Sequence, residues 1–172
     1  PTLARVLRGM TPPSGTAPDA AWFVALARAM KAAYAERLSG LGDAEPQAAE
    51  SCTTHLTVCD AAGTMVSMTS TLLSSMAAVV QMLAFVDGFG MDPQAAAQHP
   101  RINVSDAETV HADQRLTADV LAALRADGPT EVVEHAVLPV NFACPNLIQD
   151  RDGQRTGISD ALSPWSAAVA QI

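Results

Sequence analysis

Apolar and β-branched positions gather in two neighbouring segments near the middle of the chain, residues 54–60 and 64–71. The three residues between them are small, and the last of these is Gly63. A three-residue loop ending on glycine is typical of a type I turn closed by a glycine bulge. The pattern therefore predicts a β-hairpin.

The register of this hairpin follows from its loop. If Asp60 pairs with Thr64 across the loop, the other pairs follow by counting back along both strands. The pairs expected are Val58 with Val66, Leu56 with Met68, and Thr53 with Thr71. Two threonine hydroxyls are thus expected to face each other at the open end of the hairpin.

Helical spacing of apolar residues marks the segments on both sides of the hairpin. The helices expected are residues 1–10, a helix from a capping box at 16–19 to Gly40, residues 76–85, a short helix with Asp92 as cap and Pro93 first, and residues 118–126 between Thr117 and Gly128. Trp22 and Tyr34 are expected to pack in the core. In the third helix one apolar face is expected to hold Val79, Met82, Leu83 and Val86.

Further strands are expected at residues 102–104, 132–140 and 142–149. Arg151-Asp152-Gly153 has the composition of a second three-residue hairpin loop. Helices and strands alternate without repeats, so the elements predict a mixed α and β domain.

The composition is that of a globular protein with one core. The chain has 172 residues, of which 49% are hydrophobic, and this length needs no second domain. The net charge is −8 and the ten basic residues are scattered, whereas nucleic-acid binding takes clustered Lys and Arg. No apolar run reaches the ~18 residues that a membrane-spanning helix needs.

No metal or organic cofactor is indicated by the side chains that could bind one. Cys52, Cys59 and Cys144 lack metal-type spacing, and the histidines are isolated from one another. Cys59 and Cys144 are expected to be small buried residues in strands. The sequence begins at Pro1 rather than Met, so any targeting segment is expected to lie outside it, which leaves the localisation open between periplasm and cytoplasm.

The threonine at position 53 has a chemistry available that other threonines lack. A hydroxyl is a poor nucleophile without a neighbouring base, and a threonine obtains one from its own α-amino group once the preceding peptide bond is cut. That amine titrates near neutrality, at a pKa of roughly 7.7 to 8.0. The cut would fall between Cys52 and Thr53, and Thr71 would hold the Thr53 oxygen. Without further information, a Thr-Thr pair in a strand simply favours β-structure.

Several motifs occur in the order found in one known family. The most specific is Thr53-Thr54-His55 followed by a hydrophobic strand, Asp60, a glycine turn and residues 67–72. Others are residues 27–37, 41–43, 76–91, 97–101, 146–149 and 157–160. Together they resemble the small subunit of the γ-glutamyltransferases, members of the N-terminal nucleophile hydrolase superfamily, and the large-subunit helix that precedes it.

The resemblance implies a fold and a division of the chain. The family's fold is a four-layer αββα sandwich of the α+β class, of which this chain would cover a part. Residues 1–52 correspond to the end of the large subunit with its linker, and residues 53–172 correspond to the small subunit. Both subunits arise from one precursor and form one domain, and a homodimer stays open.

The resemblance also implies an activity. Thr53 would become a chain terminus by self-cleavage after Cys52 and would attack the γ-glutamyl amide of glutathione or a related compound. The acyl group would pass to water or to an amine acceptor, with Thr71 orienting the nucleophile. No nucleic acid, membrane span or cofactor takes part.

The chain departs from the family pattern in three places. The family has a long segment after the position of Ser75 that carries substrate contacts and an oxyanion hole, and here Ser75 runs directly into Met76. Position 73, which contacts substrate in the family, is Leu73. The later Ser-Asp-Pro-Arg-like signature reads Ser159-Asp160-Ala161-Leu162.

These departures leave alternatives open. The chain is an active transferase or hydrolase with segments elsewhere, an amidase of altered acyl preference, or an uncleaved, inert homologue with a binding or structural role. His55 shares a strand face with position 53 and is expected to pack or hydrogen-bond there rather than act as the base.

Overall fold

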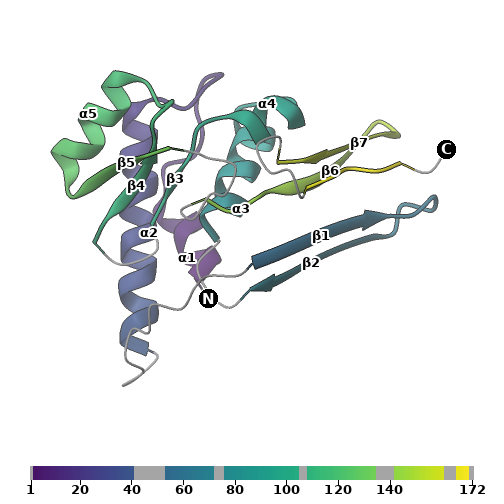
Figure 1. The fold of residues 1–172 in the computed structure, drawn as a ribbon, viewed down its shortest axis with the longest axis horizontal. Coiled ribbons are helices and arrows are strands. Elements are labelled where there is room, and N and C mark those ends of the chain that lie inside the picture. The colour runs from purple at the N-terminus through teal and green to yellow at the C-terminus, as the bar shows by residue number, and fades with distance from the viewer. Residues whose placement is uncertain are drawn as a thin grey trace.

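The structure is a computed structural model that describes residues 2–40, 53–71, 76–104, 108–134, 142–160 and 166–170. Figure 1 shows a helical body with a three-stranded sheet, from which two β-hairpins extend side by side. The predicted mixture of helices and strands is confirmed, and the fold is α+β.

The helices form most of the body. They are α1 (Thr2–Gly9), α2 (Ala20–Gly40), α3 (Met76–Leu83), the π-helical turn η1 (Ala84–Gly88), α4 (Pro93–Gln98) and α5 (Ala118–Asp127). Among the described residues, no helix is both long enough and apolar enough to cross a membrane.

The starts of helices α4 and α2 are each capped by an aspartate side chain. Helix α4 begins as predicted, because Asp92 Oδ1 accepts hydrogen bonds from the Gln94 and Ala95 amides, both at 3.0 Å. Helix α2 begins later than the predicted capping box, with Asp19 Oδ1 accepting from the Trp22 amide at 2.8 Å. Pro18 explains the shift, because a proline disfavours helical geometry at the residue before it.

A three-stranded sheet lies within the body. Its order is β3 (Ile102–Asn103), β4 (Val110–Asp113) and β5 (Thr130–Val133). Strands β3 and β4 are antiparallel, while β4 and β5 are parallel and are joined through α5. The sequence did not predict β4, and the strand expected at 132–140 ends at Val133, with residues 135–141 outside the described ranges.

The two hairpins pair neighbouring strands. They are β1 (Thr53–Cys59) with β2 (Met65–Thr71), and β6 (Asn146–Arg151) with β7 (Gln154–Ser159). In the second hairpin Arg151 pairs with Gln154, so the loop has two residues rather than the expected three. Asp152 and Gly153 have φ values of 54° and 78°, which fits the type I′ turn that Asp-Gly favours.

Three layers lie one over another where the hairpins meet the body. Helix α4 contacts one side of β6–β7, and Leu147 and Ile158 on that side pack against the core. The other side of β6–β7 faces β1, as Figure 1 shows from the two ribbons running alongside each other. The order is therefore helix, sheet, sheet.

The core is built around α2, as predicted for its aromatic residues. Trp22 and Tyr34 are 4% and 6% exposed, and the Trp22 ring meets the Phe89 ring edge to face at 5.3 Å. The face predicted for the third helix is wrong in part. Met82 and Val86 are buried, but Val79 and Leu83 are 42% and 47% exposed. Val79 and Leu83 lie four residues apart on one exposed face of the regular helix α3. The π-helical turn η1 follows Leu83 and changes the angular spacing only of later residues such as Val86.

Gln81 supplies a polar connection inside this core. Its side chain is fully buried and pairs with both backbone groups of Ile102, donating from Nε2 to the carbonyl at 2.8 Å and accepting from the amide at Oε1 at 2.9 Å. The Gln81 side chain thus makes the two hydrogen bonds to Ile102 that a neighbouring strand would make with β3.

Replacing Gln81 with leucine should destabilise the fold by about 2 to 4 kcal/mol, because two buried backbone groups of Ile102 lose their partners. Urea unfolding followed by circular dichroism measures the change. Gln94→Leu on the exposed side of α4 is the matched control and should change stability little; equal losses in both variants would contradict the role given to Gln81.

Candidate active site in the first hairpin

The register of β1 and β2 is the one predicted from the loop. The backbone pairs include Val58 with Val66, Leu56 with Met68, and Thr53 with Thr71. The Asp60 amide donates to the Thr64 carbonyl at 3.0 Å and so closes the last pair before the loop. The two threonine positions therefore lie opposite each other at the open end, where Figure 1 shows the hairpin joining the helical body.

The loop itself explains why the register is fixed. Gly63 has a φ of 88°, a left-handed geometry that glycine adopts without strain, and its amide donates to the Asp60 carbonyl at 3.1 Å. Asp60 Oδ1 also accepts from the Thr64 amide at 2.8 Å. Hydrogen bonds from the Thr64 backbone lower the pKa of Asp60, so its carboxylate stays charged and holds the loop.

Polar contacts fasten this hairpin to the second one. The Thr57 hydroxyl donates to Asn146 Oδ1 at 2.8 Å, across 89 residues of sequence. Arg155 donates from Nη1 to the Asp60 carbonyl and from Nε to Asp150 Oδ2 at 2.8 Å, and the bond to Asp150 raises the pKa of Arg155. The half of β1 next to the Gly63 loop is thereby held against β6–β7.

Strand alternation assigns the candidate positions to one face of the hairpin. Positions 53, 55 and 57 share a face, and their partners 71, 69 and 67 share it too. Because Thr57 bonds to Asn146, this is the face that looks toward β6–β7. A substrate that reached the Thr53–Thr71 pair would therefore sit at the junction of the two hairpins and the body.

The other predicted residues fall into two groups. Cys52 and Leu73 lie outside the described residues. The expectation for the cysteines is wrong for Cys144, which is exposed and precedes β6, while Cys59 is half-buried in β1. Pro145 lies between Cys144 and the first residue of β6 and lacks the amide that a ladder position would use.

Comparisons with known proteins give one kind of match. No protein-family model and no curated protein matches the chain. Among solved structures, the chain is similar to the gamma-glutamyltranspeptidase from Pseudomonas nitroreducens complexed with L-DON. The identity is 18% and the TM-score is 0.48, and the alignment covers 74% of this chain and 67% of that chain. This similarity is one of fold.

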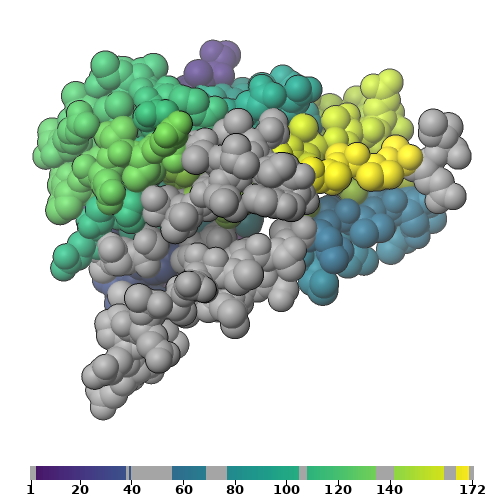
Figure 2. All heavy atoms as spheres, viewed as in Figure 1, coloured from purple at the N-terminus to yellow at the C-terminus, as the bar shows by residue number. Residues whose placement is uncertain are grey.

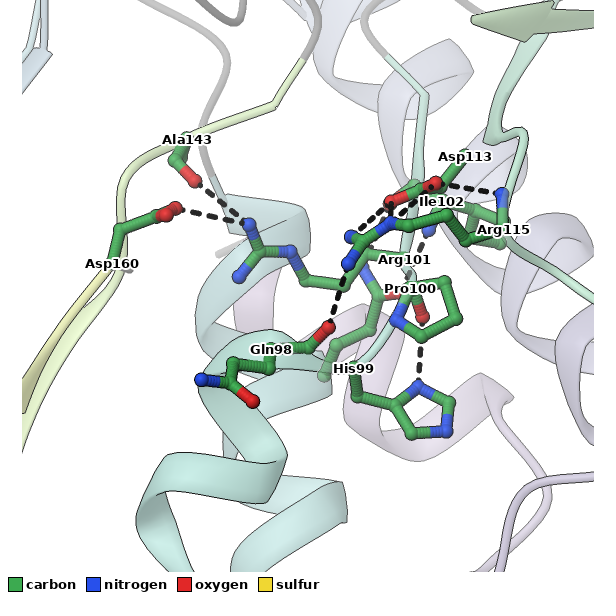
Figure 3. A network of polar contacts seen from close by, with 10 residues as sticks. Gln98, His99, Pro100, Arg101, Ile102, Asp113, Arg115, Ala143 and Asp160 are labelled. Carbon is green, nitrogen blue, oxygen red and sulfur yellow. Dashed lines mark hydrogen bonds and ion pairs between the residues drawn. The ribbon is translucent and has the colours of Figure 1, made fainter. Parts of the chain in front are cut away.

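A buried ion pair that the sequence did not predict joins the second hairpin to the body. Arg101 follows α4 and donates from Nη2 to Asp160 Oδ2 at 3.4 Å and to the Ala143 carbonyl at 3.3 Å. The two charged side chains are 1% and 0% exposed (Figure 3). Burial lowers the pKa of Arg101, and the nearby Asp160 acts against that shift. Arg101 lies 59 residues from Asp160 in the chain, so no spacing rule connects them.

A second ion pair lies on the other side of Arg101. Asp113 is fully buried and accepts from Arg115 Nη2 at 2.5 Å, while Arg115 Nη1 donates to the Gln98 carbonyl at 3.0 Å. The Asp113 amide donates to the Arg101 carbonyl at 3.0 Å (Figure 3). The end of α4, strand β4 and the start of β3 are thus linked in one polar network.

Removing one partner of the Arg101–Asp160 pair should be costly. Arg101→Met leaves the Asp160 carboxylate buried without its cation, and we expect a loss of about 3 to 5 kcal/mol in urea unfolding. The control is Arg28→Met, which removes an ion pair with Asp127 whose arginine is 70% exposed. This control should have little effect. Similar losses in the two variants would show that the buried pair does not hold the hairpin.

His99 should make the fold sensitive to mild acid. Its ring packs 4.5 Å from the Phe85 ring, and Nδ1 lies 2.8 Å from the Pro100 carbonyl oxygen. Burial lowers the pKa of His99, so the unfolded chain binds its proton more readily than the folded one. This contribution to stability is complete above the unfolded pKa of about 6.5 and is lost as pH falls below it.

We therefore expect unfolding free energy to fall between about pH 7 and pH 5, and His99→Asn to flatten that slope. Denaturant titrations at a series of pH values measure both curves. An unchanged slope in the variant would assign the acid sensitivity to another group.

Proposed function

We propose that the chain is a γ-glutamyl transferase or hydrolase that acts on glutathione or related γ-glutamyl amides through Thr53. The backbone pairing of Thr53 with Thr71 carries this proposal. The pairing sets a candidate nucleophile and a second hydroxyl-bearing residue opposite each other at the end of an antiparallel ladder. The motifs around these residues, which resemble the γ-glutamyltransferases, supply the substrate class.

The proposed reaction begins with cleavage of the bond between Cys52 and Thr53. The freed α-amine of Thr53 takes the proton of its own hydroxyl, and Oγ1 attacks the γ-glutamyl carbonyl carbon. The amine then gives the proton to the leaving nitrogen, and a γ-glutamyl ester remains on Thr53. Water or an amine acceptor attacks that ester, its proton passes to the α-amine, and Oγ1 leaves with a proton. Thr71 orients Oγ1 throughout.

Under this proposal residues 1–52 are the end of a large subunit and residues 53–172 belong to a small subunit of the same domain. The observed order of α4, β6–β7 and β1–β2 supports three consecutive layers of an αββα sandwich. The fourth layer would cover the free side of β1–β2.

The short connection after β2 favours a second candidate. Only four residues separate Thr71 from Met76, where α3 begins. Each missing oxyanion donor lowers an acyl-transfer rate by roughly 100- to 1,000-fold. An inert homologue that stays uncleaved, or an amidase whose acyl preference is changed at Leu73, fits this connection.

The decisive variant is Thr53→Ala in the full-length protein. Purified wild type should separate into two pieces on a denaturing gel, with Thr53 at the new amino terminus by mass spectrometry. The variant should stay in one piece and lose all turnover of a chromogenic γ-glutamyl anilide, because both steps use the same hydroxyl. Thr54→Ala, one residue along β1, is the matched control and should be cleaved.

The outcomes separate the candidates. A wild-type chain that stays whole after long incubation excludes the enzyme and leaves the inert homologue. Cleavage without hydrolysis of the anilide indicates the amidase with altered preference. Cleavage or turnover that persists in Thr53→Ala would show that another residue is the nucleophile.

A further inference from the structure

The first hairpin extends from the body alongside the second one. Figure 2 shows β1–β2 at the margin of the molecule, with the segment 166–170 and the second hairpin next to it. Thr53 lies at the end of β1 that joins the body, and the Gly63 loop lies at the other end. The place of Thr53 relative to the second hairpin therefore depends on the angle at which β1 runs along β6–β7.

Two polar contacts between the hairpins differ in stiffness. The Thr57 hydroxyl donates to Asn146 Oδ1 at 2.8 Å in a half-buried setting. This hydroxyl sits on a β-branched carbon, whose rotation is strongly restricted. The other contact is the bond from Arg155 to the Asp60 carbonyl. The Arg155 side chain is 35% exposed and rotates about several bonds, so it follows a displacement of the strand easily.

Asn146, the acceptor of the stiffer contact, is attached to the body through both strands of its hairpin. It pairs with Ser159, and the next residue, Asp160, belongs to the buried ion pair with Arg101. Arg101 also donates to the carbonyl of Ala143, three residues before Asn146. One buried side chain thus holds the chain on both sides of the Asn146–Ser159 pair, which gives Asn146 a fixed position.

The two contacts also lie at different distances from the candidate nucleophile. Thr57 is four positions from Thr53, or about 14 Å at about 3.4 Å per residue, whereas Asp60 is seven positions or about 24 Å away. If β1 were held at Asp60 alone, a tilt of about 3° would move Thr53 by roughly 1 Å. A displacement of that size can lower an enzymatic rate about 100-fold, because reacting atoms have to lie within about 3.5 Å of each other.

We propose that Thr57 and Asn146 are positioning residues for the reaction at Thr53. Their hydrogen bond sets the angle of β1 against β6–β7 and so places Thr53 beside the bound acyl group, while Arg155 steadies only the end near the loop. In this role neither Thr57 nor Asn146 touches the reacting atoms. The inference rests on the proposed function and adds two residues to that site.

Thr57→Val in the full-length protein tests this role, because valine keeps the branched shape and removes the donor. For a chromogenic γ-glutamyl anilide, kcat should fall about 10- to 100-fold and KM should change less than about threefold, as expected when positioning rather than substrate binding is lost. Thr57→Ser retains the hydroxyl and should recover most of kcat. Circular dichroism checks that each variant is folded.

Two comparison variants show whether the effect is specific. Thr156→Val makes the same exchange on an exposed position of β7 that shares the α4 side with Ile158, and it should leave kcat unchanged. Arg155→Gln removes the softer contact and should lower kcat less than about threefold.

A double variant shows whether Thr57 and Asn146 act as one unit. Thr57→Val and Asn146→Ala each remove the same hydrogen bond, so their combination should lower kcat no more than about threefold beyond either change alone.

Amide hydrogen exchange followed by mass spectrometry reports on β1 without any turnover. Peptides that cover β1 should exchange about 2- to 10-fold faster in Thr57→Val than in wild type, because the strand separates from β6–β7 more often. Peptides from α5, which lies outside the hairpins, should exchange at the wild-type rate, and Thr156→Val should leave exchange in β1 unchanged.

The results separate this inference from the proposed function. If wild type is cleaved and active, the positioning role alone is overturned by full kcat in Thr57→Val, by an equal loss in Arg155→Gln, or by additive losses in the double variant. A higher KM with kcat intact would overturn it as well and assign Thr57 to substrate binding. A wild-type chain with neither cleavage nor turnover removes the proposed function and the catalytic role of the pair together, and faster exchange of β1 in Thr57→Val would then show that the hydrogen bond is purely structural.

Discussion

The ion pair between Arg101 and Asp160 is the contact on which the arrangement of the two hairpins depends. Arg101 stands where α4 turns into β3, and Asp160 directly follows β7, so the pair joins the body to the base of the second hairpin. Burying a charged side chain raises the free energy of the folded state unless an oppositely charged partner stays beside it. The second hairpin then holds the first through Thr57 and Arg155. The position of the candidate nucleophile is therefore set by contacts that begin at a helix end far away in sequence.

The parts of the fold that depend on local chemistry could be predicted from the sequence. The loop ending on Gly63 sets the register of β1 and β2, and with it the pairing of Thr53 and Thr71. Asp92 and Pro93 define the start of α4 in the same way. In each case a few adjacent residues determine the geometry, so no distant contact can move it.

The parts that depend on distant contacts could not be predicted. Strand β4 alternates apolar and polar residues over only four positions, Val-His-Ala-Asp, and it forms because β3 and β5 pair with it. The exposed face of α3 differs from expectation because nearly all of its side chains are apolar, so the sequence does not show that Val79 and Leu83 face outward. Arg101 and Asp160 each lie in a motif of the sequence, but they are 59 residues apart and no local pattern pairs them. The site could therefore be assigned to a hairpin, but the residues that position this hairpin could not.

Alternation along β1 places positions 53, 55 and 57 on the side that faces β6–β7, and Leu56 and Val58 on the other side. Because the pairing is anchored at the Gly63 loop, inserting or deleting one residue between that loop and Thr53 would turn position 53 to the opposite side. A change of two residues would keep its direction and move it by one step of the ladder. Natural variants of this hairpin should consequently differ in strand length by even numbers. A designer who lengthens β1 should likewise add residues in twos to keep position 53 on the same side.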